Sequence, residues 1–207
     1  MNQIITKKIQ GVGWSGLVVQ SENYEMDLLE LIRRYPEKYP FFLESTSRGN
    51  RQNRYSIAFF EPEILLEKKK NQLNFLESFN SLWKSQIIHQ SKRVYRNKKI
   101  PFCGGWFVYL GYEVANEIEP KLSIPDSPYL LPDAFAARVN TSIIYDHVDQ
   151  TFFITSDKKE YEEDFHKILD DFNNLDNNNF EKTSEGSIKI HSKGSSYEHQ
   201  NQVKSCI

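Results

Sequence analysis

The sequence predicts an α+β fold, with a largely antiparallel β-sheet and helices packed on it. Its segments follow the order strand, helix, strands, helix, strands, helix, without the regular alternation that a parallel sheet requires. Residues 134–146 and 151–155 are rich in β-branched and aromatic residues and flank the short turn 147–150, which is typical of an antiparallel hairpin. A chain of 207 residues is also long enough to bury a substantial core.

Short apolar runs bounded by Gly and Pro predict the strands, and apolar residues at helical spacing predict the helices. Asn23 is the expected N-cap of the first helix, which Pro36 ends, and Asp157 is the expected N-cap of the third. Besides the hairpin, the predicted strands cover 3–9, 14–20, 41–45, 54–60 and 64–66, and the predicted helices cover 24–35, 75–88 and a segment after Asp157 that runs to Phe172.

The most apolar and glycine-dense run of the chain is 101–113. Its character predicts a buried strand, too short to span a membrane, followed by a short helix from Tyr112. Gly104 and Gly105 would let the backbone take a positive φ or approach another segment closely. Because Cys103 lies inside this run, we expect a buried structural thiol there, not a disulfide or a catalytic group.

Composition and charge exclude some classes of function. The net charge is −2 and the basic residues are dispersed, so the charge pattern of a nucleic-acid binder is missing. Five Lys or Arg residues in 92–99 could attract an anion, but a solvated linker is preferred because no stacking pattern of aromatic residues accompanies them. The first residues lack the apolar segment of a signal peptide, so we expect a cytoplasmic protein without a membrane partner.

No motif for phosphate binding, metal-dependent proteolysis or nucleophilic hydrolysis is present, so we predict no catalytic residue and no metal ligand. Glu113 and Glu117 share a helix face and would suit a metal only if other ligands converged; a solvated face is the preferred interpretation. Asp146 and His147 are neighbours, but adjacent strand positions point to opposite faces, so a turn is preferred over a catalytic pair.

One arrangement suggests a small polar pocket. A predicted strand ends at Glu44 and Ser45, and the next begins at Arg54 after a polar loop. Glu44 could hold an ammonium group, Ser45 a carboxylate oxygen, and Arg54 could close the site or pair with Glu44. A purely structural Glu44–Arg54 pair across adjacent strands explains the same residues. Both interpretations stay open at this point.

Three blocks of residues then follow one another over about 36–156. They are Phe42-Leu-Glu-Ser45 with Arg54-Tyr-Ser56 and Glu61-Pro62; Pro101-Phe-Cys-Gly-Gly-Trp106 with Leu110-Gly-Tyr-Glu113 and Glu119; and Leu131-Pro-Asp133 with Ile144-Tyr-Asp-His147. In this order the blocks resemble the N-terminal part of component I of the chorismate-utilising synthases, which are the large subunits of anthranilate synthase and aminodeoxychorismate synthase. The second block, followed by Ile118-Glu-Pro120, looks closer to the aminodeoxychorismate branch.

The resemblance implies a ligand and a partner. In this family the N-terminal domain contributes to a tryptophan pocket, and the positions implied here are Glu44, Ser45, Gln52, Asn53, Arg54 and Tyr55. The chorismate and Mg²⁺ sites of the family belong to a C-terminal catalytic domain, so no cofactor is expected in this chain. A glutamine amidotransferase subunit would be the partner of the full-length protein, with L-tryptophan as a ligand.

Composition and resemblance together divide the chain into a domain similar to the N-terminal part of component I over 1–172, an Asn-rich linker over 173–194, and the start of a truncated chorismate-binding domain over 195–207. The expected function is that of an aminodeoxychorismate synthase component I in para-aminobenzoate and folate biosynthesis, which converts chorismate and glutamine-derived ammonia to 4-amino-4-deoxychorismate; this chain alone should be inactive. The alternatives are an anthranilate synthase component I fragment of tryptophan biosynthesis, or a free-standing regulatory module that binds an amino acid.

Overall fold

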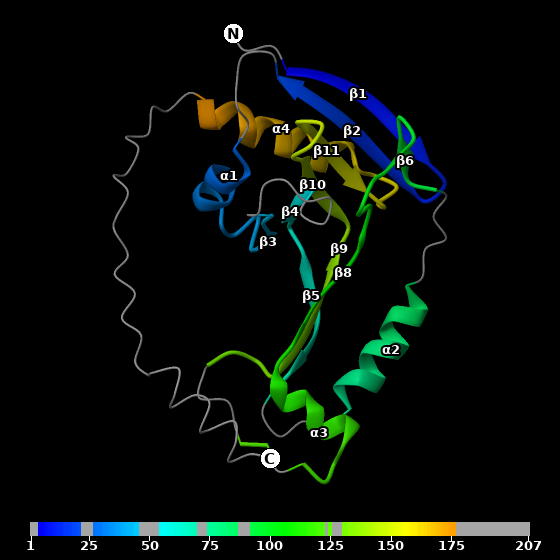
Figure 1. Cartoon of the computed structure of the whole chain (residues 1–207), viewed down its shortest axis with the longest axis vertical. Coiled ribbons are helices and arrows are strands. Elements are labelled where there is room, and N and C mark those ends of the chain that lie inside the picture. Colours follow the sequence, from blue (N-terminus) through cyan, green and yellow to red (C-terminus); the bar gives the residue numbers. More distant parts are fainter. Residues whose placement is uncertain are drawn as a thin grey trace. The chain divides into compact units, whose positions relative to one another are not determined.

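A six-stranded antiparallel sheet forms the larger layer of the fold (Figure 1). The computed structural model describes residues 4–21, 27–45, 54–69, 74–86, 92–122, 124–125 and 130–176, all within a first compact unit that spans Met1–Asn177. The strands are β1 (Ile4–Gly11), β2 (Trp14–Ser21), β3 (Phe41–Leu43), β4 (Tyr55–Phe60), β10 (Thr141–Asp146) and β11 (Thr151–Ser156). Their order is β1-β2-β11-β10-β4-β3, which places the three-residue β3 at an edge.

A three-stranded antiparallel sheet continues from the larger one. It contains β5 (Glu63–Lys68), β8 (Gly105–Leu110) and β9 (Ala134–Val139), with β9 in the middle. A two-stranded hairpin is formed by β6 (Val94–Tyr95) and β7 (Lys98–Lys99). With the four α-helices that the described residues form, the α+β prediction with a largely antiparallel sheet is confirmed.

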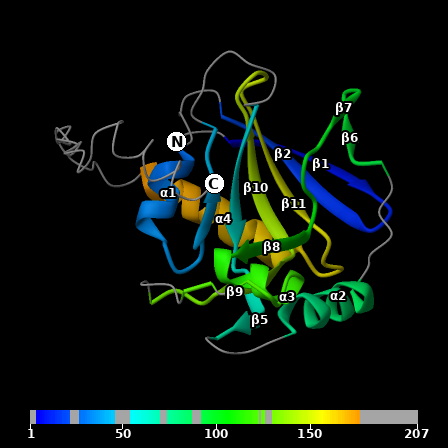
Figure 2. The same ribbon diagram turned by 60° about the horizontal axis from the view of Figure 1, so that its bottom comes forward.

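Alternation along the strands divides the core of the larger sheet into two faces. Leu17 and Val19 of β2 pack with α1 (Leu28–Arg34) and α4 (Glu162–Asp176) on one face. Val18 instead packs with residues around the β6–β7 hairpin on the other. Figure 2 shows α1 and α4 close together, apart from that hairpin.

The smaller sheet has its own helices. α2 (Phe75–Ser85) packs through Phe75 and Phe79 against Trp106 of β8, and the single-turn η1 (Tyr112–Val114) leads directly into α3 (Ala115–Ile118). Within the described residues, no helix has the length and apolar character needed to cross a membrane.

Two predicted helix caps were wrong. α1 begins at Leu28 and not at 24, because Asp27 accepts hydrogen bonds from the N–H groups of Leu29 and Glu30 at 2.8 and 3.3 Å; Asn23 lies outside the described residues. Asp157 does not cap α4, which begins five residues later; its carboxylate pairs with the buried guanidinium of Arg138 instead.

Three segment boundaries also differ from the prediction. The segment 134–146 bends at Asn140, so its two halves belong to different sheets as β9 and β10. α4 continues to Asp176, so the predicted linker cannot begin at 173. The basic stretch 92–99 is largely exposed, as expected, but residues 94–99 form the β6–β7 hairpin and not a linker.

The buried strand predicted in the run 101–113 is only partly buried. β8 lies at the edge of the three-stranded sheet, and Val108, Tyr109 and Leu110 are 37–52% exposed. These three residues are consecutive and so point to alternate faces, which means that side chains on both faces of β8 are partly exposed towards its C-terminal end. Cys103 is fully buried, as expected.

Candidate functional site

The predicted polar pocket lies where β3 meets β4 at the edge of the larger sheet. The two strands are antiparallel, with Leu43 opposite Ile57. The residues just after β3 therefore lie beside the first residues of β4. This register brings Ser45 next to Ser56, and the N–H of Ser45 donates a hydrogen bond to Ser56 Oγ at 3.0 Å.

A chain of polar contacts extends from Ser45 to the turn after β10. Ser56 Oγ lies 2.7 Å from His147 Nε2, and the exposed His147 ring packs edge-on against Tyr145 with 4.7 Å between ring centroids. The hydroxyl oxygen of Ser45 is buried and has no hydrogen-bond partner among the described residues. The site thus offers one unused hydroxyl beside a serine–histidine contact.

Arg54 does not pair with Glu44, so the predicted Glu44–Arg54 pair was wrong. Its Nε and Nη2 atoms bind the carboxylate of Asp146, and Nη2 also lies 3.0 Å from Asp149 Oδ2. The hydrogen bonds that Arg54 donates to Asp146 are the main reason why the pKa of Arg54 lies above its ordinary value. Arg54 therefore ties β4 to the β10–β11 turn, while Glu44 is exposed.

Tyr55 points to a different surface from Ser56. Its ring belongs to the apolar cluster on the hairpin face, and its hydroxyl donates to the carbonyl oxygen of Lys99 at 3.2 Å. Burial is the largest cause of its raised pKa. Of the six predicted tryptophan-site residues, the structure therefore brings only Ser45 to the serine–histidine contact, and Gln52 and Asn53 lie outside the described residues.

Glu113 and Glu117 do not form the solvated pair expected from their spacing. Glu117 is only 6% exposed at its side chain and binds the ammonium of Lys68, which is 2% exposed, at 2.6 Å. It also accepts hydrogen bonds from the N–H groups of Phe75 and Leu76, which begin α2. In the described part of the chain, no group of three or more His, Cys, Asp or Glu side chains is placed to hold a metal ion.

The sequence did not assign a binding role to Ser56 or His147. Both residues lie within the blocks that carry the family resemblance, and that was the available signal. Local patterns placed His147 correctly in a turn. They could not bring it to Ser56, because that contact depends on β10 pairing with β4.

The structure defines an α+β domain with polar side chains gathered at one sheet edge. No protein-family model matches the chain. Three curated proteins are similar to it, and each is named anthranilate synthase component 1. The protein from Acetivibrio thermocellus is 26% identical over 136 residues, covering 61% of this chain and 28% of that protein. The protein from Acinetobacter calcoaceticus is 28% identical over 151 residues, covering 63% and 30%. The protein from Leptospira biflexa is 28% identical over 111 residues, covering 51% and 24%.

This weak similarity supports a relationship between this chain and the chorismate-utilising enzyme family. The matches span only 24–30% of the length of these curated relatives.

Proposed function

We propose that this chain is the N-terminal, non-catalytic portion of a component I synthase of the chorismate-utilising family. In this proposal the edge formed by β3 and β4 contributes part of a pocket for an amino acid, with L-tryptophan as the ligand. The whole protein would transfer ammonia, supplied by a glutamine amidotransferase subunit, to chorismate. The similarity to three proteins named anthranilate synthase component 1 supports the family part of this proposal.

The observation that carries the binding site is the hydroxyl of Ser45. A buried hydroxyl without a hydrogen-bond partner costs about 1–3 kcal/mol, and Ser45 Oγ has none among the described residues. The carboxylate of an amino acid could accept a hydrogen bond from this hydroxyl, and its ammonium group could donate one to it. Such a ligand would relieve the cost.

Calorimetry with L-tryptophan on the full chain tests this site. We expect Ser45→Ala to weaken binding about tenfold or more, since a hydrogen bond to a charged group of the ligand, worth about 1.5–3 kcal/mol, is lost. Ser81→Ala is the matched control: Ser81 is exposed on α2, and its hydroxyl only donates to the carbonyl oxygen of Glu77. Equal binding by the wild type and Ser45→Ala would remove Ser45 from the site. Submicromolar binding by this chain alone would instead favour a free-standing amino-acid sensor.

Incubation with chorismate, Mg²⁺ and ammonia tests the non-catalytic assignment. We expect no aminated product, because the chorismate and Mg²⁺ sites implied by the family resemblance belong to a C-terminal catalytic domain, and the described residues hold no group of three or more His, Cys, Asp or Glu side chains placed to bind a metal ion. Formation of anthranilate or aminodeoxychorismate would contradict the assignment.

The branch of the family is the finer part of the proposal. The Gly-Gly-Trp106 block followed by Ile118-Glu-Pro120 favours aminodeoxychorismate synthase, whereas the names of the relatives favour anthranilate synthase at least as strongly. Sequencing the DNA after codon 207 and assaying any catalytic portion encoded there would distinguish the branches. Anthranilate or aminodeoxychorismate as the product decides between them.

A further inference from the structure

The β6–β7 hairpin covers one end of the larger sheet, on the face opposite α1 and α4. Three contacts hold it there: the Tyr55 hydroxyl donates to the carbonyl of Lys99, the ring of Tyr95 meets the ring of Phe153 edge-on with 5.7 Å between centroids, and Ile100 is buried in the same apolar cluster. A pocket of about 210 Å³ lies between the hairpin and the sheet. Its walls come from β2, β4, β10, β11 and the hairpin itself.

The two carboxylates of this pocket are already neutralised. Asp146 is held by Arg54 and also accepts hydrogen bonds from two backbone N–H groups of the turn. The ammonium of Lys98 lies 2.5 Å from each carboxylate oxygen of Asp149. Arg54 Nη2 also donates a hydrogen bond to Asp149. The charges of Asp146, Asp149, Arg54 and Lys98 therefore sum to zero.

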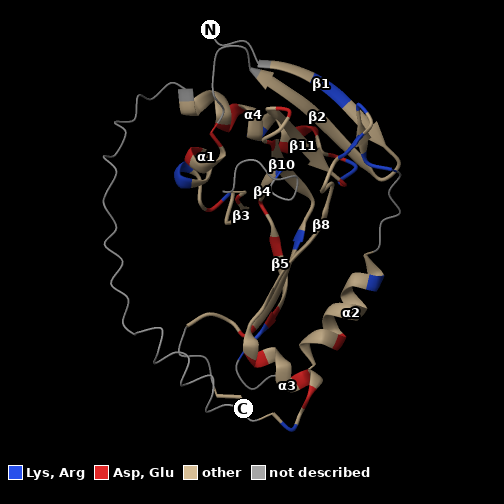
Figure 3. Ribbon diagram, viewed as in Figure 1, with Lys and Arg blue, Asp and Glu red and all other residues tan. Residues whose placement is uncertain are grey.

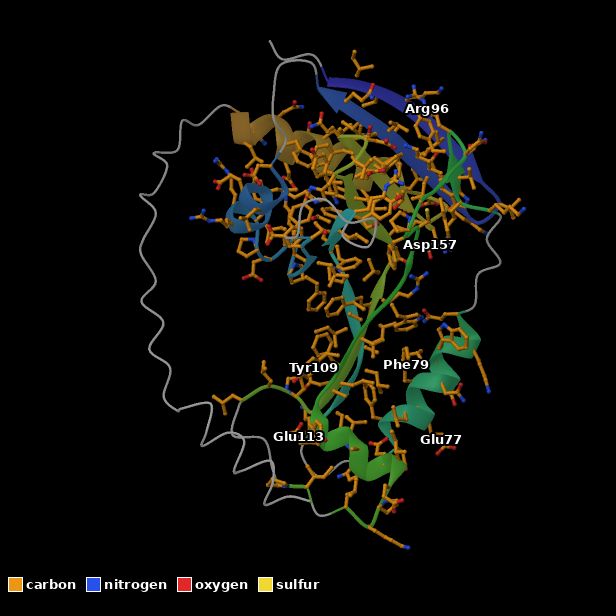
Figure 4. The ribbon with its side chains drawn as sticks, in the orientation of Figure 1. Glu77, Phe79, Arg96, Tyr109, Glu113 and Asp157 are labelled. Carbon is orange, nitrogen blue, oxygen red and sulfur yellow. The ribbon has the colours of Figure 1, made fainter. Side chains whose placement is uncertain are left out.

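Two cationic side chains remain in the lining. Arg96 and Lys99 form no ion pair with any described residue. The guanidinium of Arg96 lies over the ring of Tyr95, 5.2 Å from its centroid. Basic residues (blue) lie on β1 and on the neighbouring hairpin in Figure 3, and Figure 4 labels Arg96 on that hairpin. The pocket therefore carries two positive charges in excess.

Three aromatic rings lie beside Gln20, Ile100 and Thr151 in the uncharged part of the lining. Tyr55, Tyr95 and Phe153 all face the pocket, and Phe153 is buried. Flat apolar walls favour a ring as ligand, because stacked or edge-on contacts between aromatic groups add about 0.5–1.5 kcal/mol beyond the area that they bury. An inorganic anion would satisfy the two cations but leave these walls uncovered.

We infer that this pocket binds a small aromatic carboxylate, with its ring against Tyr55, Tyr95 and Phe153 and its carboxylate facing Arg96 and Lys99. The site is separate from the serine–histidine contact, because Tyr55 and Ser56 are adjacent on β4 and point to opposite faces of the sheet. The inference does not depend on the proposed tryptophan site.

Titration of the full chain with benzoate, followed by ¹H–¹⁵N NMR, tests the inference. We expect saturable shifts of the backbone amides of Tyr95, Arg96 and Lys99, with a Kd of about 1 mM for so small a ligand. Benzamide has the same shape without the charge and should bind about tenfold more weakly, since charge-assisted hydrogen bonds are lost. Inorganic phosphate should not compete at equal concentration.

Substitutions of Arg96 and Lys99 test whether these two cations bind the carboxylate of the ligand. Arg96→Gln and Lys99→Gln should each weaken benzoate binding about fivefold, a modest effect because both side chains are exposed. Lys92→Gln is the matched control, since Lys92 belongs to the same basic stretch but does not line the pocket; it should bind benzoate like the wild type. Absence of saturable shifts, equal binding of benzamide or phosphate, or wild-type affinity in both lining variants would each overturn the inference.

Discussion

Replacing Glu117 by Gln removes a charge that connects three elements of the smaller layer. The Glu117 carboxylate on α3 binds the buried ammonium of Lys68 on β5 at 2.6 Å and accepts N–H hydrogen bonds from Phe75 and Leu76 at 3.1 and 3.0 Å. Breaking one side of a buried ion pair typically costs about 3–5 kcal/mol. Gln retains one acceptor oxygen for the start of α2, so we expect a loss of about 3 kcal/mol in unfolding free energy.

The same contacts give this stability a pH dependence. Burial would raise the pKa of Glu117, but the N–H groups of Leu76 and Phe75 and the ammonium of Lys68 outweigh it, so the pKa lies below its ordinary value of 4.5. A lowered folded-state pKa means that the stabilisation is fully present above the unfolded value and is lost as the pH falls through the folded one. The difference between the wild type and Glu117→Gln should therefore shrink as the pH falls below 4.5.

Urea denaturation at pH 7 and pH 3 measures both effects. At pH 7 the expected loss corresponds to a Tm lower by about 6–12 °C for a domain of this size. Glu119→Gln is the control, because Glu119 is exposed and just after α3. Adding Lys68→Met to Glu117→Gln should recover more than half of the loss, since no unpaired buried charge remains. A loss below about 1 kcal/mol at pH 7, or one equal to that of Glu119→Gln, would refute the buried-pair argument.

Two further predictions concern the segment before β8. Gly104 has a φ of 98° and a β-carbon there would lie 2.1 Å from Asp157 Oδ2, so Gly104→Ala should destabilise the fold by about 2–4 kcal/mol; Gly105→Ala, which meets only a ring at 3.1 Å, should cost less in the same denaturation assay. Burial raises the pKa of Cys103 to about 12, so in a Cys206→Ser variant a thiol reagent at pH 8 should react only as fast as the chain unfolds. Rapid labelling of the native variant would show that Cys103 is accessible.

Local sequence patterns were sufficient to predict the class of fold and the position of most strands. Runs of β-branched and aromatic residues and the turn residues between them predicted β4, β11 and the segment that contains β10, because these signals lie within each segment and its neighbours in sequence. Burial of the run 101–113 was not predictable in this way. An apolar strand looks the same in sequence at the centre and at the edge of a sheet, and only the pairing order β5-β9-β8 shows that β8 is an edge strand with three exposed apolar residues.

The ion-pair partners of charged residues were predicted less well than the strands, because they too depend on how distant segments pair. Arg54 was compared with nearby Glu44, but its partner Asp146 is 92 residues away. Glu117 looked solvated because Lys68, its partner across 49 residues, belongs to another element. The sequence around a carboxylate identifies its neighbours on the same helix, but not a buried cation on a distant strand. Ion pairs between distant elements can therefore be predicted only once the sheet topology is known.

The tripeptide Arg54-Tyr-Ser56 shows how one matched block can serve two sites. Successive residues of a strand point to opposite faces, so Ser56 contacts His147 while Tyr55 reaches Lys99 of the hairpin. Arg54 precedes both and fixes the strand end to Asp146. A change at Arg54 would therefore disturb both sites, whereas Ser45→Ala and Arg96→Gln each act on one. Separate loss of tryptophan and benzoate binding in those two variants would show that the two faces of β4 bind independently.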